Sequence, residues 1–285
     1  MVLPIGPSSA TIGALNLCAV DDFGVTWILD DNGVVGWGAP GGTLAPTQKP
    51  RQRGAWAGLS YAQARPMTMA GVCIAPTAAL ASDALDRLID ACSLDDTTLT
   101  VVESERSRWC TVRRDGPVLD PQWIGTCAFT WSIQVVALDP RKLGAPLTDS
   151  TALPSTSGGL TIPYTIPYTI PSVQVSGQVN LFNPGNETGP VTMCVDGPCS
   201  GPVITHVGSG LSLVFSASLV LGVGEWIDID MEAHSVLANG QSSRVQWVTS
   251  RGWSGFEKGS NTWALTAAVY DPATLLTVTA TPADK

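Results

Sequence analysis

Two carboxylates in the C-terminal half stand at a spacing that could support catalysis. Asp228 and Asp230 lie two residues apart in the segment Trp226–Asp230, so on a strand their side chains would share one face. Paired carboxylates can bind calcium or act as acid and base in sugar hydrolysis, here with Glu225 close by. The polar outer face of a strand produces the same pattern, and a catalytic acid would need burial to raise its pKa. We favour the strand face and expect no enzyme.

The cysteines suggest a second chemistry, metal binding. Cys194 and Cys199 are separated by Val-Asp-Gly-Pro, and a turn there could bring the thiols together to pair or to hold a metal. A structural zinc site needs four ligands, and His206 and His234 are the only histidines. Two reduced thiols beside a turn are the simpler interpretation, so we expect no metal and no cofactor. The other cysteines have apolar neighbours and read as small buried side chains: Cys18, Cys73, Cys92, Cys110 and Cys127.

The chain has ten tryptophans, and one of them could bind a sugar. An indole ring can stack on a sugar ring, although most tryptophans are packing residues because each buries a large area. Trp263 alternates with Leu265 and other apolar residues, which indicates a core position. Trp253 stands between Gly252 and Ser254, as in a loop. Trp253 is therefore the candidate carbohydrate contact, and a carbohydrate-binding module is the alternative function.

Two other functional motifs, a dinucleotide-binding fingerprint and a catalytic triad, are not supported by the rest of the sequence. Gly36, Gly38 and Gly41 match the G-x-G-x-x-G fingerprint of dinucleotide-binding folds. That fingerprint must open a helix, and Pro40 and Pro46 do not suit one here. With two histidines in the chain, a Ser-His-Asp triad has little to draw on.

Strands must carry most of these residues. Apolar side chains alternate with smaller or polar ones from Cys127 to Ala137, which predicts a strand with one buried face. The same alternation runs from Leu211 to Leu221 and predicts a second long strand.

Two Asn-Gly pairs predict hairpin turns, because both central residues of the favoured turn need a positive φ. Asn32-Gly33 separates Val25–Leu29 from Val34–Trp37. Asn239-Gly240 separates Ser235–Ala238 from the segment 244–248.

A single helix is indicated, near residues 78–92. Thr77 or Ser82 could cap its start, and Asp83, Asp86 and Asp90 would line its outer face. Apolar residues recur there at three- and four-residue spacing: Ala81, Ala84, Leu85, Leu88, Ile89 and Cys92.

These patterns predict a mainly β chain in two domains. Residues 1–142 should form a β-barrel or sandwich with one α-helix, and residues 172–285 a β-sandwich. Residues 143–171, rich in Pro, Ser and Thr, should form a linker. Within it, TIPYTIPYTIP should be a stiff, extended spacer of polyproline character. A ligand for a proline-binding groove is the alternative, but the usual PxxP spacing is absent.

The charge distribution excludes several partners. The net charge is −9, and residues 1–142 carry 11 basic and 14 acidic side chains against 4 and 10 in residues 143–285. Neither half has the basic field of a nucleic-acid-binding surface. No run of 18 apolar residues occurs, so we expect no membrane insertion. Only 14% of residues are charged, which suggests either that copies or partners cover much surface or that the β surface is rich in Ser and Thr.

Arginines cluster in the N-terminal half, and they form either a solvated face or subunit contacts, for which Arg is well suited. The cluster also includes Arg106 and Arg108. The candidate subunit-interface residues are Arg51, Arg53, Arg65, Arg113 and Arg114.

Several segments of the N-terminal half resemble the distal tail proteins of siphophages, the Dit-like minor tail proteins of phages that infect actinobacteria. They are the predicted hairpin ending in Gly36-Trp37, Lys49–Trp56 leading to Tyr61 and Arg65, the helix near 78–92, and the strand closing in Leu138–Lys142. Leu143 departs from the pattern, since an aromatic residue is expected there.

The C-terminal half is similar to the galectin-like β-sandwich that such proteins often carry. The similarity rests on Glu225–Asp230, Asn239-Gly240 and Gly259–Trp263. The TIPY repeat looks like an addition to the family pattern.

The resemblance implies a structural protein of a non-contractile phage tail, a ring-forming adaptor between the tail tube and the baseplate or tip proteins. The N-terminal domain would form a homohexameric ring, with the tail tube protein above it and hub or tip proteins below. The C-terminal domain would brace neighbouring tip proteins or contact host surface glycans. The location would be the distal end of the tail in the virion, after assembly in the host cytoplasm. Ring closure would also remove exposed sheet edges.

Overall fold

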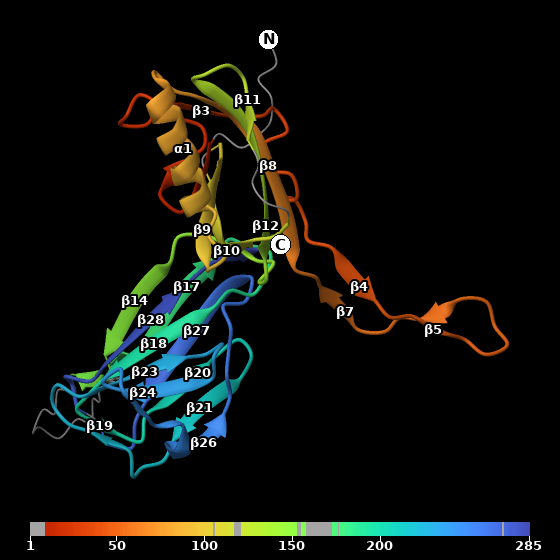
Figure 1. The fold of residues 1–285 in the computed structure, drawn as a ribbon. Helices are drawn as coiled ribbons and strands as arrows, with labels where there is room; N and C mark the ends of the chain where they lie inside the picture. Colours follow the sequence, from red (N-terminus) through yellow and green to blue (C-terminus); the bar gives the residue numbers. More distant parts are fainter. Residues whose placement is uncertain are drawn as a thin grey trace, which may run out of the picture. The chain divides into compact units, whose positions relative to one another are not determined.

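The chain forms two compact units, residues 1–144 together with Lys285, and residues 145–284 (Figure 1). The computed structural model describes residues 9–104, 106–116, 121–152, 155–157, 173–175, 177–269 and 271–285. Antiparallel strands dominate both units, and the described residues contain one α-helix, in the first unit. This confirms the predicted fold class, a β-barrel or sandwich with one helix followed by a β-sandwich.

One strongly curved, nearly closed sheet forms the body of the first unit. Its strands are β1 (Ser9–Ile12), β2 (Leu15–Asn16), β3 (Thr26–Leu29), β8 (Arg65–Ile74), β9 (Thr97–Glu103), β10 (Arg106–Arg114), β11 (Gln122–Trp123), β12 (Ala128–Ala137) and β13 (Lys142–Leu143). Their order is β2-β1-β9-β10-β12-β8-β3, with β11 added beside β12 and β13 beside β10.

The two longest strands of this sheet, β8 and β12, pair over their whole length, from Arg65 opposite Ala137 to Ile74 opposite Ala128. Burial alternates along both strands, as the pattern from Cys127 to Ala137 predicts. Gly71 is required in β8, because a Cβ there would lie 2.1 Å from the carbonyl oxygen of Ile28.

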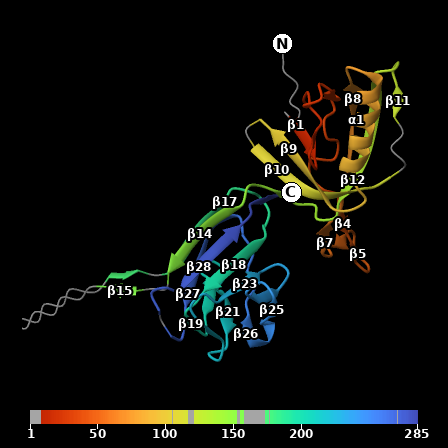
Figure 2. The same cartoon turned by 60° about the vertical axis from the view of Figure 1, so that its left-hand side comes forward.

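Helix α1 (Ala78–Ala91) lies beside β8 and β12 (Figure 2). The hydroxyl of Thr77 caps it by accepting a hydrogen bond from the Leu80 amide at 3.3 Å, so Thr77 rather than Ser82 is the N-cap. Ala81, Ala84 and Leu88 face the core, but Ile89, predicted to join them, is 41% exposed. No helix in the described residues is long and apolar enough to cross a membrane.

The hairpin predicted at Asn32-Gly33 is not formed. β3 pairs with β8, and Val35 continues along the same edge of β8 by bridging to Thr68. The turn that ends at Gly33, where φ is +60°, therefore separates β3 from Val35 without reversing the direction of the chain along β8. The reason is that ten-residue β8 offers an edge long enough for both segments.

Two sheets packed face to face make up the second unit. One has the order β14 (Leu147–Ala152), β28 (Leu275–Ala280), β18 (Val191–Asp196), β23 (Trp226–Asp230), β24 (Ser235–Ala238), β25 (Ser242–Ser243). The other has the order β17 (Gln178–Asn183), β27 (Gly259–Thr266), β20 (Val203–His206), β21 (Leu211–Phe215), β26 (Val248–Arg251). Shorter elements are β19 (Cys199–Ser200), β22 (Val220–Leu221), β29 (Ala283–Asp284) and the 3₁₀ helix η1 (Val245–Trp247).

Trp263 of β27 is fully buried between the sheets, which confirms its predicted core position. Its indole nitrogen donates a hydrogen bond to the Ser254 hydroxyl at 3.1 Å. Buried strand residues of both sheets surround it, so this unit has a complete core of its own.

Two strand predictions for the second unit are only partly correct. Asn239-Gly240 does form a hairpin turn, but the returning strand is β25 rather than the predicted segment 244–248, which contains η1. The predicted strand from Leu211 to Leu221 is broken into β21 and β22 by a turn in which the Leu219 amide bonds to the Ser216 carbonyl.

Part of the segment expected to be a linker, residues 143–171, lies in this sandwich. β14 pairs with β28 from Leu147 opposite Ala280 to Ala152 opposite Leu275. Farther on, β15 (Ser155–Ser157) pairs with β16 (Val173–Val175). The TIPY repeat between them lies outside the described residues.

Candidate functional site

A long hairpin, which we call the arm (residues 38–64), projects from the body of the first unit (Figure 1). Two short ladders hold it together, β4 (Gly42–Leu44) with β7 (Ser60–Ala62), and β5 (Thr47–Gln48) with β6 (Ala55–Trp56). Isolated two-stranded hairpins are at best marginally stable in water. The arm therefore lacks the support that the long strands β8 and β12 of the body receive from the core.

The arm exposes large apolar side chains to water, which is energetically unfavourable. From Gly41 to Ala64 every residue is exposed except Lys49, which is half-buried. Four large apolar residues are among them: Leu44 at 56% exposure, Trp56 at 54%, Leu59 at 73% and Tyr61 at 64%. Several large exposed apolar residues on one short element, which has no core to bury them, favour a surface that another protein covers.

The end of the arm is basic. Lys49, Arg51 and Arg53 lie in the turn between β5 and β6, and the arm contains no acidic residue. Arg51 occupies this turn with a φ of +66°. The arm thus combines apolar contact area with an uncompensated positive charge, the composition found in the cores and rims of interfaces.

Arg65 fixes the point where the arm returns to the body. Its side chain is 1% exposed, and Nε and Nη2 donate to the Pro140 carbonyl at 3.0 and 2.6 Å. Nη1 donates to the carbonyls of Gly36, Trp37 and Gly38, where the arm begins. Burial lowers the pKa of Arg65 from its ordinary value, although an arginine remains protonated.

Lys142 of β13 also donates hydrogen bonds to the carbonyls at the start of the arm. Its Nζ donates to the carbonyls of Trp37 and Gly38 at 3.1 and 3.3 Å, and it lies 5.6 Å from the centre of the Trp37 ring. Two buried cations therefore hold the carbonyls at the arm's root. This arrangement sets the direction of an otherwise unsupported hairpin.

The five arginines predicted at an interface divide into three places. Arg51 and Arg53 lie together at the exposed end of the arm. Arg113 and Arg114 lie on β10, where Arg113 bonds to Asp96 at 2.5 Å. Arg65 differs from the prediction, because its guanidinium is buried against carbonyls of its own unit and presents no surface to a neighbour.

The carboxylates considered for catalysis are engaged in local structure. Asp228 accepts a hydrogen bond from the Trp226 indole at 3.0 Å, and Asp230 accepts from the amides of Glu232 and Ala233 in the following turn. Glu225 accepts from the Gly222 amide at 2.7 Å. Asp228 and Asp230 border a cavity of about 300 Å³ on the six-stranded sheet. These hydrogen bonds explain the spacing of the three carboxylates by their places in a strand and its turns, without a catalytic role.

Cys194 and Cys199 are both free thiols. Burial raises the pKa of Cys194 to about 12, with Asp196 and Asp228 adding to the shift, and burial raises that of Cys199 to about 11. In the described part of the chain, no three residues of the types His, Cys, Asp and Glu form a cluster that could hold a metal ion. His206, one possible zinc ligand, instead contacts Ser209 and Asn261 through its two ring nitrogens.

Trp253, the predicted sugar contact, lies in the loop after β26 and is half-buried. The ring of His234 stacks against it, with the centroids 4.9 Å apart and the planes at 20°. Because one face of the indole is covered, at most the other face could stack on a sugar. A sugar contact at this residue remains a prediction.

The arm itself was missed at the sequence level. Its strands have no buried face, so they show no periodicity. The available signal was compositional, namely a long stretch with basic, aromatic and leucine residues but no acidic one.

Comparison with known proteins gives a match at the level of structure. No family model matches the chain, and no curated protein sequence is similar to it. The structure is similar to Dit (gp 19.1) of phage SPP1, described as a paradigm of the hub adsorption apparatus in phages that infect Gram-positive bacteria. The TM-score is 0.64 at 12% identity, over 96% of this chain and 98% of that one.

Two structures of the phage P2 baseplate in its activated conformation also match. With calcium the TM-score is 0.52 at 9% identity, over 90% of both chains, and with strontium it is 0.50 at 10% identity, over 87% and 92%. The likeness of the second unit to a galectin-like sandwich stays a prediction, because the names of these neighbours do not mention such a domain. The chain therefore has the fold of phage hub and baseplate proteins, which confirms, for the fold, the resemblance to siphophage distal tail proteins.

Proposed function

We propose that this protein is a structural component of a non-contractile phage tail tip, a ring-forming adaptor that joins the tail tube to the baseplate or tip proteins. Copies of the first unit supply the ring contacts, and the second unit serves neighbouring tip proteins. The partners are a tail tube protein on one side and hub or tip proteins on the other. The site of action is the distal end of the tail in the virion.

The observation that carries the proposal is the arm. It is anchored at its root by Arg65 and Lys142 and has no core of its own, yet it exposes Leu44, Trp56, Leu59 and Tyr61. In a single copy, the fixed root orients the hairpin but does not bury its apolar side chains. A neighbouring copy would cover the apolar side chains and pair or shield the free strand edges.

The similarity to hub and baseplate proteins over nearly the whole chain supports the same assignment. The low proportion of charged residues, 14%, also suits a surface covered by copies and partners. We propose a ring of six copies, with the tail tube protein on one side of it and the hub or tip proteins on the other.

Imaging of the purified full-length chain, together with its mass by analytical ultracentrifugation, tests the proposal. We expect closed rings with a fixed number of subunits, and a ring of the same diameter at the lower end of the tube in assembled tails. A chain that is monomeric in solution at all concentrations, and that forms no ring in the tail, would overturn it.

No catalytic role is proposed, because Glu225, Asp228 and Asp230 are used in turns and along a strand. A sugar-binding function of the second unit is not favoured by any contact of Trp253. Binding to host glycans is therefore a separate question, to be decided by a glycan array with wild type and Trp253→Ala.

A further inference from the structure

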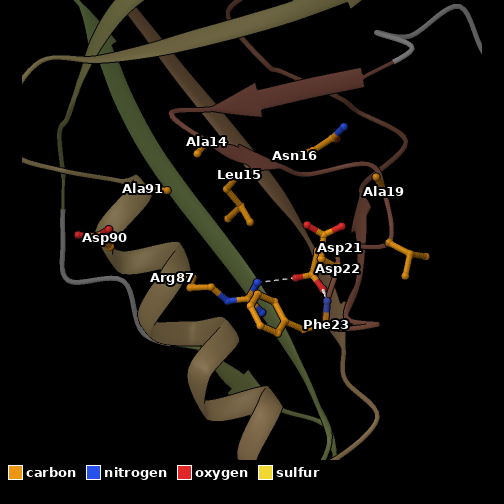
Figure 3. A pocket seen from close by; sticks show the side chains of 11 residues that line it. Ala14, Leu15, Asn16, Ala19, Asp21, Asp22, Phe23, Arg87, Asp90 and Ala91 are labelled. Carbon is orange, nitrogen blue, oxygen red and sulfur yellow. Dashed lines mark hydrogen bonds and ion pairs between the residues drawn. The ribbon is translucent and has the colours of Figure 1, made fainter.

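A pocket with both acidic and apolar walls lies between α1 and the loops that flank β2 (Figure 3). Its volume is about 360 Å³, which is in the lower range of small-ligand pockets. The loop of residues 19–23 forms one wall, and Arg87, Asp90 and Ala91 of α1 form another. Leu15 lies at the base of the pocket, between the helix and the loop (Figure 3).

The loop wall is held in place by Asp21. The Asp21 carboxylate accepts hydrogen bonds from the amides of Val25 and Phe23 at 2.9 and 3.0 Å, and from the Trp27 indole at 3.3 Å. Arg87 closes the network with an ion pair at 2.6 Å and places its guanidinium 4.7 Å from the centre of the Phe23 ring. The pocket is therefore a fixed feature of the unit rather than a gap between mobile side chains.

The rim of this pocket has the opposite character to the end of the arm. Asp22 and Asp90 are exposed on the rim, and Asp86 is exposed one turn before Asp90 on α1. Arg87 is the single basic residue of the lining, and Asp21 neutralises it. Val20 and Phe23 add apolar surface, being 63% and 59% exposed.

We infer that the pocket beside α1 receives the end of the arm of a second copy of this chain. This inference rests on the proposed ring and specifies its contact. The basic residues Lys49, Arg51 and Arg53 would meet the acidic rim, and Trp56 would cover the apolar surface of Val20 and Phe23. Complementary charge of this kind fixes the register between partners and excludes wrong ones.

The dimensions and positions suit an interface between copies. Strands rise about 3.3 Å per residue, so a hairpin with roughly 12 residues a side reaches on the order of 40 Å. A unit of this size has a radius of gyration of about 14–15 Å, so the arm spans the width of a neighbour. Figure 1 shows the arm leaving one side of the first unit while the loop beside α1 lies on the other. A head-to-tail contact uses two different surfaces of each copy, and it gives a closed ring where the rotation between copies closes.

Charge reversal in the full-length protein tests the contact. The arm variant is Arg51→Glu/Arg53→Glu, the pocket variant is Asp22→Lys/Asp90→Lys, and a third protein combines all four changes. A matched control, Arg251→Glu/Lys258→Glu, makes the same charge change as the arm variant at exposed residues of the second unit. Asp21 is left intact because it holds the loop. Ring formation is measured by analytical ultracentrifugation over a range of salt concentrations, and circular dichroism checks the fold of each variant.

We expect the arm and pocket variants each to weaken association by about tenfold or more at low salt, with a smaller effect at high salt. The combined variant should recover wild-type association within about threefold, and the control should match wild type. If wild type forms rings but the combined variant is no better than the single-site variants, or the pocket variant assembles normally, this pocket does not receive the arm and the ring stands without it. If wild type never forms rings, in solution or in the tail, both proposals fall.

Discussion

The arm of the first unit and the sandwich of the second unit are both built from short antiparallel strands, but their side chains have different surroundings. In the sandwich, burial alternates along the strands, and Trp263 is fully enclosed between two sheets. In the arm, the strands β4 to β7 are exposed on both faces, and Trp56 is 54% exposed. The sandwich is complete within one chain, whereas the arm lacks the layer that would cover it.

In the arm, a fixed root and a stable hairpin are separate properties. Arg65 and Lys142 determine where the arm points, and they do so with buried hydrogen bonds to carbonyls. Neither residue contributes a core to the strands beyond the root. The arm thus has a defined direction without intrinsic stability, which suits an element that folds fully against a partner.

The largest effect is expected in the sandwich, at Trp263. Trp263→Ala should lower the free energy of unfolding of the second unit by about 3–5 kcal/mol, since it empties a fully enclosed volume. Hydrogen exchange as a function of urea, read separately on peptides from each unit, measures the loss. A loss below about 1 kcal/mol would mean that the sandwich is not closed around this residue.

The root of the arm should show the next largest effect. Arg65→Met removes donors to the Pro140 and Trp37 carbonyls and leaves these groups buried, so we expect the first unit to lose about 3 kcal/mol. Arg65→Lys is the matched control, since it keeps the charge but cannot reach both carbonyls, and it should lose less. If Arg65→Met were as stable as wild type, the root would not depend on these bonds.

Asp21 should show a smaller effect that depends on pH. Burial alone would raise its pKa, but the hydrogen bonds from Val25, Arg87 and Trp27 outweigh burial, and its pKa lies below the ordinary value. Because the folded-state pKa is depressed, Asp21 stabilises the fold above its unfolded pKa, about 3.9, and this contribution is lost as the pH falls through the folded value. Asp21→Asn should cost about 1.5–3 kcal/mol at pH 7.

Urea denaturation at several pH values checks this expectation. The difference between wild type and Asp21→Asn should shrink steadily below about pH 4. A difference that is constant from pH 7 to pH 3 would show that the charge of Asp21 has no part in it.

The smallest effect on stability is expected at the exposed tryptophan of the arm. Trp56→Ala should change the unfolding free energy of the isolated chain by less than about 0.5 kcal/mol, because the indole packs on no core. The same substitution should weaken ring formation, measured by analytical ultracentrifugation. A large loss of stability in the monomer would indicate that the arm is supported within its own chain.

The sequence predicted well those parts of the molecule that have a buried face. The alternation from Cys127 to Ala137 corresponds to β12, and the three- and four-residue spacing corresponds to α1. Trp263 was placed in the core for the same reason. In each case the pattern of apolar residues reflects a core that the chain itself provides.

Strand pairing, and elements that have no core within this chain, were predicted poorly. Asn32-Gly33 marks a turn, but the free edge of β8 decides which segments pair there. Arg65 was expected at an interface, although Met67 and Met69 at alternate positions place it on the buried face of β8. The arm left no periodicity at all, because no core residue of this chain faces it.

Amide hydrogen exchange of residues 38–64 tests the central claim most directly, when dilute monomer is compared with assembled rings. The account predicts rapid exchange throughout the arm in the monomer, while β8 and β12 remain protected, and strong protection of the arm once rings have formed. An arm that is already protected in the monomer, or that still exchanges rapidly in the ring, would contradict the claim that a second copy completes it.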